Sequence, residues 1–189
     1  MTEHIISLGD IEARAPDLHL IVRPVRPQPP EDFEEPYQDS NGVWVVCDNR
    51  PPDILNTYKL HGSLGVPGDV LLGKEAVWYP TCLNCGVVRY VADHPERPGY
   101  MYERIPSSRM PRNLIRWRRT VVETGVMRVG EITTEQAVMA GFQDTQGRPW
   151  WPRTEFRKNW ERRWKQAGNP WCEPGSWAWW AVVEEGHHA

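Results

Sequence analysis

Hydrophobic residues after residue 42 come in short apolar or alternating runs, a pattern typical of β-strands. Gly, Pro, Asn and Asp residues, which favour turns, separate several of these runs, and residues 124 and 125 are one such turn candidate. The strands predicted in this way cover residues 43–46, 70–72, 76–79, 87–91, 113–122, 126–129 and 177–184. Strands therefore dominate the predicted fold.

The run over residues 113–122 is the longest of these and the richest in arginine. Because side chains alternate between the two faces of a strand, we expect Trp117 and Arg119 on one face and Arg116 and Arg118 on the other. The face that carries Arg116 and Arg118 can follow a phosphate backbone.

Two helices are predicted from capping residues and helical periodicity. Thr133 and Gln136 have the spacing of a capping box, which predicts a helix of about two turns. Phe156, Trp160 and Trp164 recur at every fourth position of a second helix. An aromatic stripe of this kind usually faces inward, so we expect it in the core.

The first 40 residues show little regular periodicity, because several prolines and an acidic run interrupt them. Only residues 18–25 are expected to form a strand there. The predicted organisation is a Pro-rich acidic arm over residues 1–40, one domain over residues 41–185 and a frayed tail over residues 186–189. The fold class expected for the domain is α+β, a small curved or closed sheet flanked by short helices.

Length and composition favour one folded domain: the chain has 189 residues, of which 40% are hydrophobic. No apolar run is long enough to span a membrane, and the first residues lack the layout of a secretory signal. We therefore expect a cytoplasmic protein without a membrane partner. Four Cys in such a chain indicate reduced thiols or a metal site rather than a disulfide framework.

The formal net charge is −3, but the charged residues are distributed unevenly along the chain. Residues 1–60 hold 11 acidic and 5 basic side chains, whereas residues 109–165 hold 13 basic and 6 acidic ones. The basic residues are mostly arginine, which binds phosphate in a forked geometry and stacks on rings. The densest cluster includes Arg109 and Arg112 besides Arg116 and Arg118. It is either a nucleic-acid contact or a solvated face.

Tryptophan is concentrated near the C-terminus, since eight of the eleven Trp residues lie between Trp150 and Trp180. Trp177 and Trp179 share one face of the closing strand and Trp180 lies on the other, so one of these faces is expected to be core. Adjacent rings are difficult to bury together. Trp151, next to Trp150 in a loop, is therefore the candidate for stacking on a flat ligand such as a nucleobase.

Cys82 and Cys85 have the spacing of a zinc knuckle, with two thiols two residues apart and a Gly after them. A structural zinc ion needs four ligands, so two more would have to come from elsewhere in the chain. The residues that could complete the site are Cys47, His61, His94 and Cys172. The alternative is a hairpin tip with free thiols and no cofactor at all.

Five segments occur in a recognisable order: residues 68–71 (GDVL) with Glu75 and Trp78, 108–112 (SRMPR), 130–137 (GEITTEQA), 156–160 (FRKNW) and 177–179 (WAW). In that order and spacing they resemble phage and prophage proteins of the ASCH group, relatives of the PUA domain. The similarity covers about residues 65–184.

The resemblance implies a small PUA-like β-barrel with helices over its openings and a cleft associated with RNA or with single modified bases. Glu75, beside Lys74 at the end of a strand, would accept hydrogen bonds from a base edge at the mouth of the barrel, and Trp78 belongs to the same motif. The alternative for Lys74 and Glu75 is a surface ion pair or a turn. We therefore expect a phage-type module that binds RNA or a modified nucleotide-like ligand in an aromatic, Arg-lined cleft within the bacterial host cell.

One departure from the family bears on catalysis. Many ASCH proteins carry a Lys in an N-terminal motif, and some relatives use it to remove the acetyl group from acetylated cytidine. The corresponding residues 11–26 contain no Lys, and the first Lys of the chain is Lys59. We therefore expect binding rather than deacylation. The alternatives are an amidohydrolase or nuclease of the same fold and a phage protein that blocks a host protein.

Overall fold

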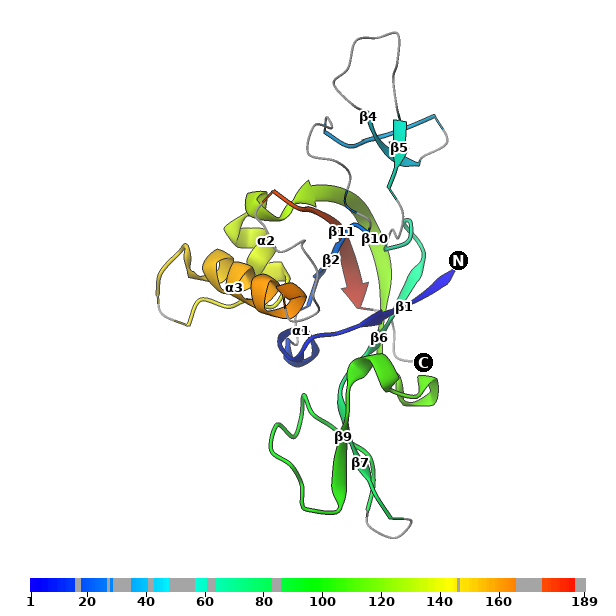
Figure 1. Cartoon of the computed structure of the whole chain (residues 1–189), viewed down its shortest axis with the longest axis vertical. Coiled ribbons are helices and arrows are strands. Elements are labelled where there is room, and N and C mark those ends of the chain that lie inside the picture. Colours follow the sequence, from blue (N-terminus) through cyan, green and yellow to red (C-terminus); the bar gives the residue numbers. More distant parts are fainter. Residues whose placement is uncertain are drawn as a thin grey trace.

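A five-stranded sheet in the order β1-β6-β10-β11-β2 forms the centre of the molecule (Figure 1). β1 is parallel to β6, and the other neighbouring pairs are antiparallel. The computed structural model describes residues 1–15, 18–26, 28, 35–40, 43–47, 57–60, 64–82, 86–145, 147–165 and 175–185. The strands of the sheet are β1 (Glu3–Ser7), β2 (Leu20–Pro24), β6 (Val70–Lys74), β10 (Trp117–Arg128) and β11 (Trp177–Glu185).

Side chains that alternate along these strands build one apolar cluster on each face of the sheet. In β11, Trp177 and Trp179 are buried in the first cluster, while Ala178 belongs to the second and Trp180 packs against it. The predicted alternation of these side chains is confirmed, and both faces of β11 contact a core. In β10, Trp117 and Arg119 are likewise buried whereas Arg118 is exposed.

Within the described residues, three α-helices accompany the sheet: α1 (Asp10–Arg14), α2 (Thr134–Met139) and α3 (Trp151–Lys165). The predicted capping box begins α2, where the Gln136 backbone N–H donates to Thr133 Oγ1 and the Thr133 N–H donates to Gln136 Oε1. Phe156 and Trp160 of α3 are buried in the second cluster and Trp164 packs against it, which confirms the predicted aromatic stripe. Both helices lie over the same side of the sheet (Figure 1).

Two small sheets lie at opposite ends of the molecule (Figure 1). One contains β3 (Tyr37–Gln38), β4 (Trp44–Cys47) and β5 (Thr57–Lys59), and the other has the order β8-β7-β9. The strands of the second small sheet are β7 (Val77–Pro80), β8 (Arg89–Tyr90) and β9 (Tyr102–Ile105). Short 3₁₀ turns lie between β9 and β10, at η2 (Ser107–Arg109) and η3 (Arg112–Leu114), and after β10, at η4 (Val129–Glu131).

Residues 1–40 contain more regular structure than their sequence predicts. β2 corresponds to the strand expected over residues 18–25, but β1 and α1 were not expected. β1 pairs with β6 along five residues, so the beginning of the chain is part of the central sheet rather than an arm. Its hydrophobic run is too short to predict a strand, and pairing with β6 supplies what the local pattern lacks. Most of the acidic run and the tail over residues 186–189 lie outside the described residues.

The prediction for β10 was wrong at both ends. A 3₁₀ turn after Pro111 delays its start to Trp117, and the strand continues through the expected turn at Thr124 and Gly125 to Arg128. A Cβ on Gly125 would lie 2.4 Å from the Trp180 ring of β11. The glycine is therefore required by the close approach of the Trp180 ring and not by a turn.

The described strands do not close into a hydrogen-bonded barrel, because β1 and β2 remain the two edges of the central sheet. The edges nevertheless approach each other: Arg23 of β2 donates from Nη2 to the backbone carbonyl of Ser7 in β1 over 2.8 Å. The sheet is thus strongly curved. The α+β class is confirmed. None of the described helices has the length and apolar character needed to cross a membrane.

Candidate functional site

A cleft of about 390 Å³ lies between α1, the C-terminal half of α3 and the segment that joins β9 to η2. Among its described lining residues the charged side chains are all arginines: Arg104 of β9, and Arg162 and Arg163 of α3. Asn159 and Ser107 add polar groups, and the other described lining residues are apolar or Gly9. A concave surface with this lining attracts an anion.

Arg163 is held in place by a buried ion cluster. Its Nη1 lies 3.0 Å from Glu12 Oε2, and its Nη2 donates to the Ser7 carbonyl over 2.8 Å. Arg23 binds the same carboxylate, with Nη1 2.6 Å from Oε1. One carboxylate therefore serves two guanidinium groups, and the cluster keeps a net positive charge beside the cleft.

The electrostatics of Glu12 reflect this surplus of positive charge. Burial opposes ionisation of its carboxyl group, but Arg23 and Arg163 outweigh burial and lower the pKa to about 2. Burial also lowers the pKa of Arg23, against the attraction of Glu12. The Glu12 carboxylate stays ionised near neutral pH, which fixes α1, β2 and α3 around it.

A second, much smaller recess of about 20 Å³ lies directly beside the cleft and shares Gly9, Ile11, Asn159 and Arg163 with it. Its walls carry the aromatic rings of α3 and of the segment after α2, which are Phe142, Phe156, Trp160 and Trp164. The sequence predicted that aromatic rings and arginines line one cleft. In the structure the rings lie behind the arginines, in a space no larger than a water molecule.

Glu75 and Arg116 are both predicted to bind the ligand, but in the structure they form an ion pair with each other. Arg116 donates from Nε and Nη2 to the two oxygens of Glu75 over 2.9 and 3.0 Å, and it also pairs with Asp93. The guanidinium carbon lies 3.9 Å from the centre of the Tyr90 ring. The hydrogen bonds that Arg116 donates to Glu75, and those that it donates to Asp93, raise the pKa of Arg116. The Glu75 carboxylate is buried, so it does not present a free acceptor to a base edge.

Two further predicted arginines converge on β1 rather than on the cleft. Arg112 lies 2.6 Å and Arg118 lies 3.3 Å from the Glu3 carboxylate. Arg109 is exposed in η2, next to the cleft residue Ser107. The predicted basic cluster is therefore divided between Glu3 of β1, the Glu75 carboxylate and the exposed surface of η2, and none of its arginines is among the described residues that line the cleft.

The remaining predicted residues are also separated. Lys74 ends β6, and its backbone carbonyl accepts a hydrogen bond from the Leu8 N–H. Trp78 of β7 donates its indole N–H to the His94 carbonyl over 2.8 Å. Trp151 begins α3, at the end of the helix opposite to the cleft. Trp78 therefore contacts the residue after Asp93, which shares Arg116 with Glu75, whereas Trp151 lies at the far end of α3 from the cleft.

Cys82 is disulfide-bonded, which differs from the predicted reduced thiols, and Cys85 lies outside the described residues. His61 and Cys172, two of the proposed further ligands, also lie outside them. Within the described ranges no group of three or more His, Cys, Asp or Glu side chains is placed to hold a metal ion. The zinc site stays a prediction.

Sequence reasoning missed the residues that line the cleft. Arg104 lies in a Pro-rich stretch, Arg162 and Arg163 are two of several charged residues in the second predicted helix, and Glu12 belongs to the predicted arm. The Gly9-x-x-Glu12 spacing offered one local signal, because Glu12 Oε2 accepts the Gly9 N–H over 2.7 Å at the start of α1. The approach of α3 and β9 has no signature in the sequence, since it depends on contacts between distant segments.

Comparisons of the chain with models of protein families, with curated proteins and with solved structures found no match.

Proposed function

We propose that this chain is an ASCH-type, PUA-like module that binds RNA or a modified nucleotide-like ligand in the arginine-lined cleft. The observation that carries the proposal is the lining itself: Arg104, Arg162 and Arg163 surround about 390 Å³, and the described lining residues include no carboxylate. That volume is in the range of small-molecule sites. Guanidinium groups bind phosphate through two parallel hydrogen bonds, which a phosphate oxygen pair accepts.

The N-terminal part of the chain supports the family assignment. Residues 11–26 correspond to the N-terminal motif of ASCH proteins, and in the structure Ile11 lines the cleft while Glu12 and Arg23 form the ion cluster behind it. The strong curvature of the central sheet, whose edge strands are bridged by the Arg23 side chain and the Ser7 carbonyl, supports the proposed PUA-like fold. The motif lacks its Lys, which favours binding over deacylation.

The proposal is tested by titrating the protein with short RNA, uridine 5′-monophosphate and modified nucleosides while tryptophan fluorescence is recorded. Trp164 is a suitable reporter, because the Arg163 guanidinium lies 5.1 Å from its ring. We expect saturable binding at submillimolar concentration. Affinity should fall as salt rises, because phosphate contacts release counterions.

Arg104→Ala/Arg162→Ala removes two cleft arginines that are both exposed, so the core is unaffected. Since a hydrogen bond to a charged group contributes about 1.5–3 kcal/mol, the dissociation constant should rise at least ten-fold. Arg89→Ala, an exposed arginine of β8, is the matched control and should leave binding unchanged. Equal binding by both variants, or no saturation with any ligand, would contradict the proposal.

A further inference from the structure

Two adjacent tryptophans stand at the surface where α3 begins. Trp150 is 53% exposed and Trp151 is half-buried, and their ring centres are 5.9 Å apart at an angle of 59°. Trp150 contributes to the fold through its backbone, because its carbonyl accepts hydrogen bonds from the N–H and hydroxyl groups of Thr154. Exposing a large apolar indole ring to water is unfavourable, so an exposed pair of such rings is typical of a contact surface.

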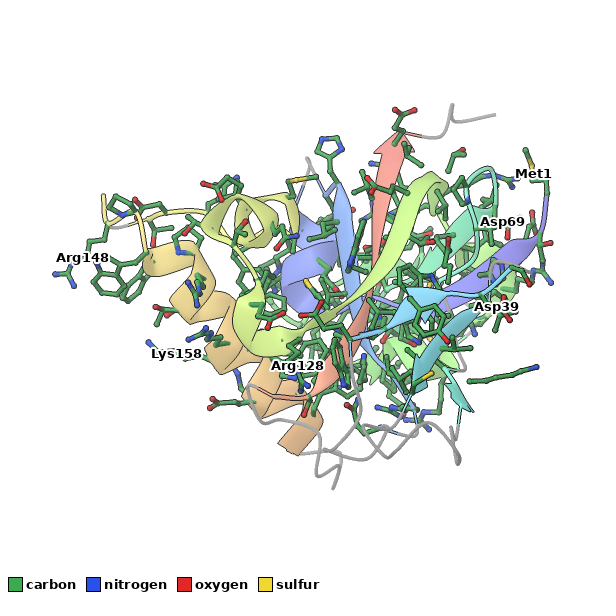
Figure 2. All side chains as sticks on the ribbon, turned by 90° about the horizontal axis from the view of Figure 1, so that it is seen from above. Met1, Asp39, Asp69, Arg128, Arg148 and Lys158 are labelled. Atoms are coloured by element: carbon green, nitrogen blue, oxygen red, sulfur yellow. The ribbon has the colours of Figure 1, made fainter. Side chains whose placement is uncertain are left out.

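Each of these rings has a cation beside it. The Arg148 guanidinium lies 5.6 Å from the Trp150 ring centre, and the Lys158 ammonium lies 5.0 Å from that of Trp151. Figure 2 shows Arg148 and Lys158 at the outer side of the molecule, along α3 and the segment before it. Flat rings flanked by cations suit a nucleotide, because a base stacks on the ring and the cation attracts the neighbouring phosphate.

The tryptophan pair and the cleft are connected along one face of α3. Trp151, Lys158 and Arg162 are separated by seven and four residues, which places them on the same side of a helix. Arg162 lines the cleft. Glu155, on the same side, is neutralised by Lys158 at 3.0 Å. With Arg148 and Arg162 at its two ends, this face keeps a positive charge.

We infer that the ligand of the cleft is an extended single strand of RNA that runs along α3. One phosphate binds among Arg104, Arg162 and Arg163, and a base further along the strand stacks on Trp150. The inference rests on the proposed function of the cleft. From Trp151 to Arg162 the helix rises roughly 16 Å. At the roughly 3.4 Å per nucleotide of a stacked strand that distance corresponds to about five nucleotides, and to fewer in an extended strand, so a mononucleotide cannot reach both ends.

The test compares uridine 5′-monophosphate with the RNA hexamer U6 on the full-length protein, with the DNA hexamer dT6 as a second strand. The variants are Trp150→Ala and, as matched control, Tyr100→Ala, which removes another exposed ring at 84% exposure. We expect U6 to bind at least ten-fold more tightly than the mononucleotide. Trp150→Ala should remove about five-fold or more of that affinity and leave mononucleotide binding unchanged. Tyr100→Ala should change neither.

The outcomes separate the inference from the proposed function. Equal affinity for U6 and the mononucleotide, or equal behaviour of Trp150→Ala and Tyr100→Ala, overturns the strand along α3 and leaves the cleft intact. Loss of mononucleotide binding in Arg104→Ala/Arg162→Ala supports the cleft independently. Tighter binding of dT6 than of U6 overturns RNA as the strand. Binding of U6 that depends on Trp150 but not on the cleft arginines supports the stacking surface and overturns the proposed function.

Discussion

At the scale of single residues, Glu75 shows how a buried charge is made tolerable. Its side chain is 3% exposed and receives two hydrogen bonds from Arg116, whose own side chain is 40% exposed. Arg116 also contacts Asp93 and the Tyr90 ring, so it connects the β6–β7 segment with β8 and the residues before β10. This arrangement gives the pair a structural role, whereas the sequence predicted a role in ligand binding.

We expect Arg116→Ala to destabilise the protein by about 2–4 kcal/mol, because it leaves the buried Glu75 carboxylate without its partner. Urea unfolding measures the change. Arg118→Ala is the matched control: its partner Glu3 is 37% exposed, and an exposed pair contributes about 1 kcal/mol or less. A stable Arg116→Ala protein that binds RNA less tightly would restore Arg116 as a ligand-binding residue.

At the scale of elements, the register of β10 and β11 depends on a missing side chain. Gly125 lies opposite Trp180 in the ladder, and the ring of Trp180 covers the position that a Cβ would take. Trp180 packs from there against the cluster that includes the aromatic stripe of α3. The glycine therefore allows β10 and β11 to stay paired from Glu123, after the register shift between Val121 and Glu123, to Arg128.

Gly125→Ala should lower the free energy of unfolding by about 1–3 kcal/mol, because the methyl group forces Trp180 out of its position. Thermal unfolding, with tryptophan fluorescence as the probe, measures the effect. Gly99→Ala is the control, since a Cβ there meets no atom within 4 Å. A Gly125→Ala protein as stable as Gly99→Ala would mean that Trp180 moves aside without cost.

At the scale of the whole molecule, the Glu12 cluster joins parts that are far apart in the sequence. Arg23 lies on one edge strand of the central sheet, Ser7 on the other, and Arg163 on the helix that forms a wall of the cleft. Because Arg23 and Arg163 both bind the Glu12 carboxylate and both donate to the Ser7 carbonyl, the curvature of the sheet and the position of the cleft arginine Arg163 depend on the same charge. Loss of that charge should affect stability and site together.

The Glu12 cluster predicts a specific loss of stability in acid. The folded pKa of about 2 lies below the ordinary value of 4.5, so the ionised carboxylate stabilises the folded state above about pH 4.5, and this contribution is lost as the pH falls toward 2. The shift corresponds to roughly 3 kcal/mol. Glu12→Gln should therefore be less stable than the natural protein at pH 7, and the difference should shrink between pH 4.5 and 2.

Denaturant unfolding at several pH values measures this difference, with Glu96→Gln, an exposed carboxylate, as the control. Asp69 also has a pKa lowered to about 2, by the Thr2 N–H and by His4. It titrates equally in both proteins, so its contribution cancels. A difference that does not depend on pH would show that Glu12 acts through shape rather than charge.

The sequence by itself determined the local elements. Alternation predicted β11, most of β10 and the common face of Trp177 and Trp179, the capping residues predicted the start of α2, and the four-residue aromatic spacing predicted the buried side of α3. Each of these signals lies within about ten residues, where backbone geometry alone relates one side chain to the next.

Tertiary structure alone decided the pairing of β1 with β6, the division of the arginines between Glu3, Glu75 and the cleft, and the convergence of Arg23 and Arg163 on Glu12. The sequence does not reveal whether an arginine side chain contacts a carboxylate or water. Which of these it meets depends on strands and helices separated by more than 100 residues along the chain, as Glu12 and Arg163 are, and the spacing of residues carries no information about such contacts.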